Sequence, residues 1–310
     1  MSGMAIGIAG YGKIARDQHV PAIAASETFE LTAIADPWTR HETLPSYPDV
    51  AAMLQAHPEV AAVALCMPPR FRAVAAREAI AAGRHVILEK PPCATMAEAE
   101  ALADQAEKAG VTLFTAWHSQ EAAGVATARE WLEGVSVRSV RVVWKEDVRV
   151  WHPGQDWIWQ EGGFGVFDPG INALSILTAI LPETLRLIDA ELSIPTNCAT
   201  PIAARLELAG EKGIPITAEF DFRQTGPQSW DIEIEADRGR LVLSNGGNRL
   251  LIDGDEVRLD PEDEYTALYA RFADLICRQE MEVDLAPMAL AEQAFAEGRR
   301  IAVEPFEEAL

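Results

Sequence analysis

The chain is poor in the features that mark secreted, metal-dependent or membrane proteins. Its four cysteines (Cys66, Cys93, Cys198 and Cys277) lie far apart and form no Cys-x-x-Cys pair, which argues against a disulfide framework or a zinc knuckle. The six histidines show no ligand spacing such as His-x-x-x-His, so we expect no metal site. The opening MSGMAIGIAG lacks the basic segment of a signal peptide, and no run of about 18 apolar residues occurs. We therefore expect a cytoplasmic protein without a membrane span.

Positive charge is also scarce. The chain has 26 lysines and arginines against 48 acidic residues, a formal net charge of −22. Such a field repels phosphate groups, so neither nucleic acids nor anionic membranes are expected partners. The 310 residues, 49% of them hydrophobic, suffice for two domains with sizeable cores.

The first 118 residues alternate short apolar runs with alanine-rich stretches. The apolar runs predict strands that are covered on both faces, and the alanine-rich stretches predict helices. We expect strands at 4–10, 31–36, 60–66, 85–89 and 111–117, and helices near 13–25, 49–56, 70–82 and 95–109. Alternating β and α elements predict that residues 1–118 form a Rossmann domain on a doubly wound parallel sheet.

The second part of the chain changes its period. Residues 216–222 and 230–236 alternate strictly between apolar and polar side chains, which is typical of antiparallel strands with one covered face. Further strands are expected at 137–144, 185–194, 203–209, 240–244 and 249–252, a hairpin turn at 245–248, and helices near 121–133, 169–181, 263–279 and 286–300. We predict an α+β substrate domain of residues 119–310 with an open antiparallel sheet and helices on one face. Its C-terminal helix could pack back on the first domain.

Residues 6–16, IGIAGYGKIAR, contain a candidate dinucleotide-binding turn. Gly10, Gly12 and Ala15 fit Gly-x-Gly-x-x-Ala between an expected strand and helix. Gly10 permits the tight turn, Gly12 lets the backbone approach a pyrophosphate, and the helix N-terminus offers N–H groups to phosphates. Asp36 ends the second expected strand, 24 residues after Gly12, where a carboxylate can accept hydrogen bonds from the adenosine ribose.

The same residues bear on the choice of cofactor. A carboxylate at Asp36 repels a 2′-phosphate, so NAD is expected, while Arg40 could reach such a phosphate and leaves NADP open. We expect the cofactor to contact Gly10, Gly12, Lys13, Ile14 and Asp36.

Two stretches, GYGKIARDQHVPA and AGRHVILEKPP, resemble the glucose–fructose oxidoreductase/inositol dehydrogenase/MocA family. The resemblance covers the whole chain and implies a nucleotide-binding domain followed by an open antiparallel sheet. Within the family, TLFTAWHS, WKEDVRVWHPGQDWIW and GVFDPGINALSIL look most like the aldose 1-dehydrogenases that act on L-arabinose and D-galactose. These enzymes oxidise the anomeric carbon of a pyranose to a lactone and reduce NAD(P)⁺.

The resemblance implies catalytic residues. Glu89 and Lys90 belong to the Glu-Lys-Pro signature, expected at the nicotinamide with a cis Lys90–Pro91 bond. Asp168 and Asn172 match the family's Asp-x-Gly-x-His, in which many relatives have histidine where Asn172 stands. Asparagine accepts no proton, so the proton from O1 would pass to Lys90 or Asp168, of which we favour Lys90. No role is assigned to Arg72, although many relatives have histidine there.

A sugar pocket is implied in the same way. Residues 144–159 hold four of the eight tryptophans, and indole faces suit the C–H faces of a pyranose. The residues that match the sugar pocket of the aldose dehydrogenases are His118, Glu146, Trp151, His152 and Trp230, to which Asp168 and Asn172 add polar groups.

Other functions and assemblies stay open. An NAD-dependent glycosidase of this fold family would release free sugar without net NADH, and a nucleotide-sensing protein would lack catalysis. The polar face of the second sheet (Glu219, Asp221, Asp231, Glu233 and Glu235) could face solvent or pair two copies of the chain in a homo-oligomer.

Overall fold

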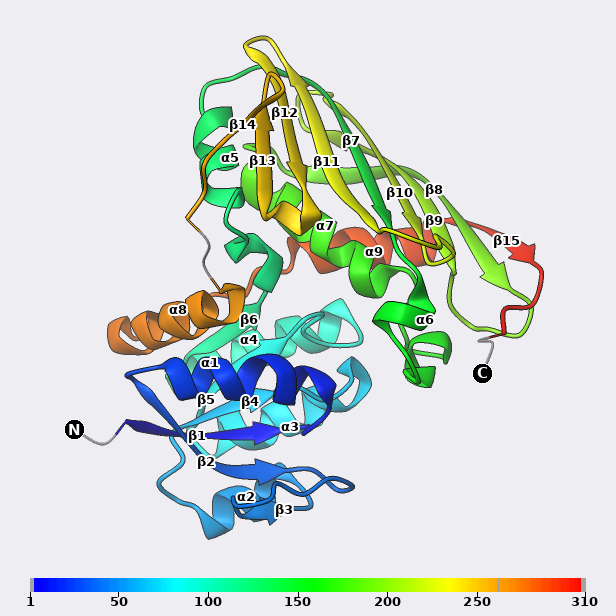
Figure 1. The fold of residues 1–310 in the computed structure, drawn as a ribbon. Helices are drawn as coiled ribbons and strands as arrows, with labels where there is room; N and C mark the ends of the chain where they lie inside the picture. The colour runs from blue at the N-terminus through cyan, green and yellow to red at the C-terminus, as the bar shows by residue number, and fades with distance from the viewer. Residues whose placement is uncertain (1–2, 261–262, 308–310) are drawn as a thin grey trace. The chain divides into compact units, whose positions relative to one another are not determined.

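The computed structural model describes residues 3–260 and 263–307, which divide into two compact units (Figure 1). The first unit comprises Met1–His118 and Asp263–Leu285, and the second comprises Ser119–Glu262 and Ala286–Leu310. Residues 263–285 therefore group with the first unit, although they follow most of the second one along the chain.

The first unit is built on a six-stranded parallel sheet. Its strands are β1 (Met4–Ala9), β2 (Phe29–Ala35), β3 (Ser46–Tyr47), β4 (Ala62–Leu65), β5 (His85–Glu89) and β6 (Leu113–Ala116), in the order β3-β2-β1-β4-β5-β6. Every residue of β4 and β6 is buried, as a sheet covered on both faces requires. This arrangement confirms the predicted Rossmann fold.

Helices between the strands and the later helix α8 belong to this unit. They are a π-helical turn η1 (Ala15–His19), α1 (Val20–Ala25), α2 (Val50–Ala56), α3 (Pro69–Ala81), α4 (Met96–Ala109) and α8 (Glu264–Arg278). Asp49 and Thr95 cap α2 and α4 by accepting from the backbone N–H groups of Ala52 and Glu98, which satisfies donors that a helix start leaves open. Gly110 ends α4 in the left-handed conformation.

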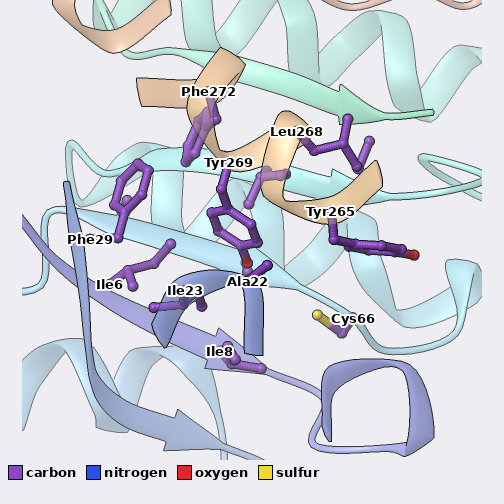
Figure 2. Packing of buried hydrophobic residues seen from close by; sticks show 14 of the residues in the cluster. Ile6, Ile8, Ala22, Ile23, Phe29, Cys66, Tyr265, Leu268, Tyr269 and Phe272 are labelled. Atoms are coloured by element: carbon purple, nitrogen blue, oxygen red, sulfur yellow. The ribbon is translucent and has the colours of Figure 1, made fainter. Parts of the chain in front are cut away.

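Helix α8 completes the core of the first unit. Figure 2 shows Tyr265, Leu268, Tyr269 and Phe272 of α8 packed with residues of β1, α1 and β2. Phe272 stacks on Phe29 with ring centroids 5.6 Å apart. Because these aromatic side chains are almost fully buried, the segment 263–285 is part of the hydrophobic core of this unit.

The second unit contains a nine-stranded sheet. Its strands are β7 (Val137–Lys145), β8 (Leu185–Pro195), β9 (Ala203–Gly210), β10 (Pro215–Asp221), β11 (Ser229–Ala236), β12 (Gly239–Ser244), β13 (Arg249–Ile252), β14 (Asp255–Glu256) and β15 (Arg299–Val303), in the order β14-β13-β12-β11-β7-β10-β9-β8-β15. The short edge strands β14 and β15 were not expected, and β15 begins where the predicted helix 286–300 was to end.

The predicted open antiparallel sheet is confirmed in most of its pairs, but two pairs are parallel. β7 pairs with β10, and β8 with β15, in parallel. Parallel neighbours need a long crossover connection, and helices α7 (Phe167–Ile180) and α9 (Ala286–Glu297) lie in the intervening chain. Alternation of apolar and polar residues predicts one covered face but carries no information on strand direction, so the two parallel pairs could not be predicted from it.

Helices cover one face of this sheet. Figure 1 shows α5 (Val125–Leu132), α7 and α9 on the same side of the strands. Phe167 of α7 meets Phe220 of β10 edge to face at 5.7 Å, and a side chain at Gly170 would overlap the Phe220 ring. The remaining helical segments are η2 (His118–Glu121), α6 (Val148–Trp151), η3 (Asp156–Trp159) and η4 (Asn245–Gly247), the last in the expected turn between β12 and β13.

The other face of the sheet carries charge pairs. Lys145 lies 2.7 Å from Glu219 on the neighbouring strand, and Arg240 lies 2.7 Å from Glu233. These pairs offset part of the negative charge on this face. Pairing of two copies of the chain through this face stays a prediction. In the described part of the chain, no helix combines the length and apolarity that crossing a membrane demands.

Candidate functional site

The glycine-rich turn follows β1 directly. Gly10 has a φ of +86°, and a side chain there would overlap the backbone of Met67, so glycine is required on both grounds. A Cβ on Gly12 would instead meet no atom within 4 Å. The backbone at Gly12 is therefore open to the close approach of a ligand, as a pyrophosphate-binding turn requires.

A cavity of about 650 Å³ lies beside this turn in the first unit. Asp36, at the end of β2, belongs to its wall and is buried. Its Oδ2 accepts from the N–H of Tyr11 at 2.7 Å, and its Oδ1 from those of Trp38 and Thr39 at 2.8 and 2.7 Å. Three backbone donors thus fix the carboxylate where the sequence expects a ribose. The wall also includes Ala9, Gly10, Gly12, Cys66, Met67, Pro68, Arg70 and Phe71.

The arginine at this cavity is not the one considered from sequence. Arg40 donates to the carbonyl of Ser46 at 2.9 Å, whereas Arg70, on the first turn of α3, lines the cavity with its guanidinium 4.7 Å from the Phe71 ring. Lys13 pairs with Asp17, and Ile14 packs partly buried against the core. The open backbone at Gly12, the fixed carboxylate and the cavity together fit a dinucleotide.

Strand β5 ends at the Glu-Lys-Pro signature. The Lys90–Pro91 bond is cis, as expected. Glu89 is buried, and its Oε2 accepts from the N–H of Lys90 at 2.8 Å. Its Oε1 accepts from the Tyr265 hydroxyl at 2.6 Å and lies 3.1 Å from His19 Nε2. The Glu89 carboxylate thus holds the backbone at Lys90 from within the core.

Charge stabilises this buried cluster. Burial opposes ionisation of Glu89, but the hydrogen bond and charge of His19 outweigh it and lower the pKa of Glu89 to about 2. Burial likewise opposes a charged His19, yet Cys66, Tyr269 and the hydrogen bond to Glu89 raise the pKa of His19 well above its ordinary value. The raised pKa of His19 and the lowered pKa of Glu89 both favour a protonated His19 beside an ionised Glu89.

His118 lies at the end of the first unit. Its Nδ1 is 2.6 Å from Glu264 Oε2, and its ring stacks on Tyr265 with centroids 5.4 Å apart. The sequence predicted His118 as a sugar ligand but missed Glu264, Tyr265 and His19. A histidine within the first helix after the glycine motif was the available signal for His19.

A second polar cluster surrounds Glu146, the residue after β7. Glu146 is buried; its Oε2 accepts from Trp230 Nε1 at 2.8 Å, and its Oε1 lies 2.9 Å from His152 Nε2. Trp151 packs on Trp230 with centroids 4.7 Å apart and is 41% exposed. An oriented carboxylate thus lies beside an accessible indole in the second unit.

His152 links this cluster to Asp168. The Nδ1 atom of His152 is 3.4 Å from Gln155 Oε1 and 3.6 Å from Asp168 Oδ2, so the imidazole lies between the carboxylates of Glu146 and Asp168. Asp168 is buried near the start of α7, and Asn172 follows four residues later on the same helix, which puts both on one side of it. The structure thus groups Glu146, Trp151, His152, Asp168 and Trp230 of the predicted sugar residues.

Across residues 3–260 and 263–307, no group of three or more His, Cys, Asp or Glu side chains could hold a metal ion. The four cysteines are free.

Comparison with known proteins places this geometry among the oxidoreductases. Residues 4–117 match the GFO/IDH/MocA model, described as an oxidoreductase family with an NAD-binding Rossmann fold. The chain is 43% identical to galactose 1-dehydrogenase of Pseudomonas fluorescens over 306 residues, 99% of each chain.

Solved structures agree with that match. The crystal structure of D-galactose-1-dehydrogenase from Rhizobium etli is 50% identical, with a TM-score of 0.95 over 99% of each chain. KijD10, a 3-ketoreductase from Actinomadura kijaniata solved in complex with NADP and TDP-benzene, has a TM-score of 0.85 over 97% of this chain and 100% of its own. At 19% identity the latter shows a common fold alone.

Proposed function

The chain belongs to the GFO/IDH/MocA oxidoreductase family, with an NAD-binding Rossmann fold, and from this premise we propose that it is an NAD(P)-dependent aldose 1-dehydrogenase. Its substrate would be a pyranose of the D-galactose or L-arabinose type, and its product the aldonolactone. C1 of the sugar loses a hydride and O1 loses a proton, so the two losses together oxidise the hemiacetal by two electrons. The full-length likeness to two galactose 1-dehydrogenases supports this substrate class.

The observation that carries the proposal is the cluster at Glu146. Its carboxylate is buried and already held by Trp230 Nε1 and His152, so it needs little reorganisation to accept a sugar hydroxyl. The accessible face of Trp151 suits the C–H groups of a pyranose. Buried groups that bind hydroxyls reject analogues lacking them, because those groups would be left unpaired.

Lys90 and Asp168 are the two proposed acceptors of the O1 proton. Lys90 carries its amine just after the carboxyl end of β5, the edge at which open α/β sheets bind their ligands. Asp168 has an imidazole 3.6 Å away that can stabilise its charge. We favour Lys90 as the base, in which case Asp168 holds a sugar hydroxyl. In the alternative, Asp168 itself takes the proton. In both cases Asn172 orients a neighbouring sugar oxygen.

The first unit would hold the cofactor, whose nicotinamide supplies the hydride acceptor. In the proposed complex the backbone at Gly10, Gly12, Lys13 and Ile14 approaches the pyrophosphate, and Asp36 accepts from the ribose hydroxyls. The charge of Asp36 favours NAD over NADP, because a 2′-phosphate would be repelled.

A steady-state assay tests this function. We expect net NADH formation from NAD⁺ with free D-galactose and L-arabinose, and lactone as the product. Conversion of a galactoside to free sugar without net NADH would instead identify a glycosidase, and activity with D-glucose but not D-galactose would refute the substrate class.

The lysine has its own test. Lys90→Ala should lower kcat by at least about 100-fold, the usual contribution of a positioned base, while the affinity for NADH stays unchanged. Glu100→Gln, an exposed change on α4, is the control. Turnover of Lys90→Ala near the wild-type rate would remove Lys90 from the mechanism.

A further inference from the structure

Arg72 is a buried cation next to the Glu-Lys-Pro turn. It lies on α3 and is 2% exposed. A guanidinium keeps its charge and all five donors in any protein environment, and an unpaired buried charge is strongly unfavourable. The groups that Arg72 meets therefore bear on its role.

The side chain of Arg72 joins two chain segments through carbonyl oxygens. Its Nη1 donates to the carbonyls of Glu89 and Pro91, the residues on either side of Lys90. Its Nη2 donates to the carbonyl of Met67 at 2.5 Å. One planar group thus holds three carbonyls, that of Glu89 at the end of β5 and those of Pro91 and Met67 outside the strands.

The turn after β5 depends on such side-chain contacts. Pairing between β5 and β6 ends at Glu89, and Pro91 and Pro92 have no N–H to donate. The N–H of Lys90 is held by the Glu89 carboxylate. Arg72 holds the carbonyls of the two flanking residues, so these contacts together constrain the backbone from which the Lys90 side chain leaves.

The contact with Met67 extends this to the cofactor turn. Met67 lines the cavity beside Gly10, and its backbone occupies the space that a side chain at Gly10 would need. Arg72 therefore connects the Lys90 turn to the backbone against which the glycine-rich turn packs.

We propose that Arg72 is a positioning residue for Lys90, clamping the Glu-Lys-Pro turn to the cofactor-binding backbone. This inference rests on the proposed function in assigning Lys90 to proton transfer. In this proposal Arg72 acts through the backbone on both sides of Lys90, whose carbonyls it holds. Lysine cannot replace it fully, because a single ammonium lacks the planar fork that reaches three carbonyls.

The test compares Arg72→Met and Arg72→Lys with Arg77→Met, an exposed arginine on the same helix. Arg72→Met should lower kcat for D-galactose by about 100-fold, the effect of a misplacement near 1 Å. The dissociation constant of NADH and the KM for the sugar should stay within about threefold of wild type, which separates chemistry from binding. Arg72→Lys should recover part of kcat, and Arg77→Met should match wild type.

Hydrogen exchange provides the second readout and needs no substrate. Exchange of the Lys90 amide, measured on peptides covering 85–93, should accelerate in both Arg72 variants, while α4 and α8 stay protected. Unchanged kcat and exchange would overturn the proposal. So would faster exchange across the whole first unit with equal losses of NADH binding and kcat, which would mark a merely structural role.

The design separates the two proposals. If wild type oxidises no aldose, the proposed function fails, and local exchange at Lys90 still decides the clamp. If Arg72→Met does not fold, Arg72→Lys carries the test, with kcat at least about tenfold below wild type at an unchanged melting temperature. Wild-type kcat in Arg72→Lys would then refute the clamp.

Discussion

Replacing Glu89 by glutamine should destabilise the first unit strongly. The change keeps the shape of the side chain but removes the negative charge of the carboxylate that His19, Tyr265 and the Lys90 amide contact. The glutamine NH₂ would face one of these donors, and His19 would lose its charged partner. Breaking a buried ion pair from one side costs about 3–5 kcal/mol, so the melting temperature should fall by on the order of 10 °C.

The pH dependence of stability gives an independent magnitude. The pKa of Glu89 falls from its usual 4.5 to about 2, and this interval corresponds to about 3 kcal/mol. Because the folded pKa is lowered, this stability is present above pH 4.5 and is lost as the pH falls towards 2. His19 has the opposite sign: its pKa is raised, so its contribution is complete below pH 6.5 and is lost as the pH rises through the folded pKa.

The assay is chemical denaturation between pH 3 and pH 9 on wild type, Glu89→Gln, Tyr265→Phe and the exposed control Glu100→Gln. Wild type should be most stable between about pH 4.5 and 6.5, and Glu89→Gln should lose most of the acid-side slope. Tyr265→Phe removes one hydrogen bond to a charged group and should cost about 1.5–3 kcal/mol. A Glu89→Gln variant within about 1 kcal/mol of wild type at pH 6, with the same acid slope, would refute a charged network.

Two further changes test the two units separately. Gly12→Val adds a side chain where no atom lies within 4 Å; folding should be normal, and NADH should bind at least about tenfold more weakly by fluorescence titration. Tight NADH binding by this variant would exclude the glycine turn from the site. Trp230→Phe removes the 2.8 Å bond to Glu146 but keeps an aromatic ring against Trp151. It should lower kcat/KM for D-galactose by about tenfold with unchanged NADH affinity, and equal losses in both would contradict a role in sugar binding.

Local sequence patterns predicted the parts of the fold that depend on local chemistry. The glycine pattern and the apolar run before Asp36 located a turn and a carboxylate that the structure brings to one cavity. Both follow from strands that end at the same edge of a parallel sheet. The strict alternation in 216–222 and 230–236 likewise found two strands with a covered face.

Contacts between distant residues could not be predicted in this way. Tyr265 reaches Glu89 across 176 residues, and His19 reaches it across 70; no period or spacing encodes such pairs. Arg40 was considered for the cofactor because it is near Asp36 in sequence, whereas Arg70 lines the cavity because α3 begins beside it. The parallel partner of β7 likewise depends on the path of the chain and not on the pattern of either strand.

Isotope transfer tests the proposed reaction most directly. Incubation of the enzyme with NAD⁺ and D-galactose carrying deuterium at C1 should yield NADH that contains the deuterium, together with unlabelled protons released from O1. Deuterium found only in the sugar or in water, with no label in NADH, would contradict hydride transfer from the anomeric carbon.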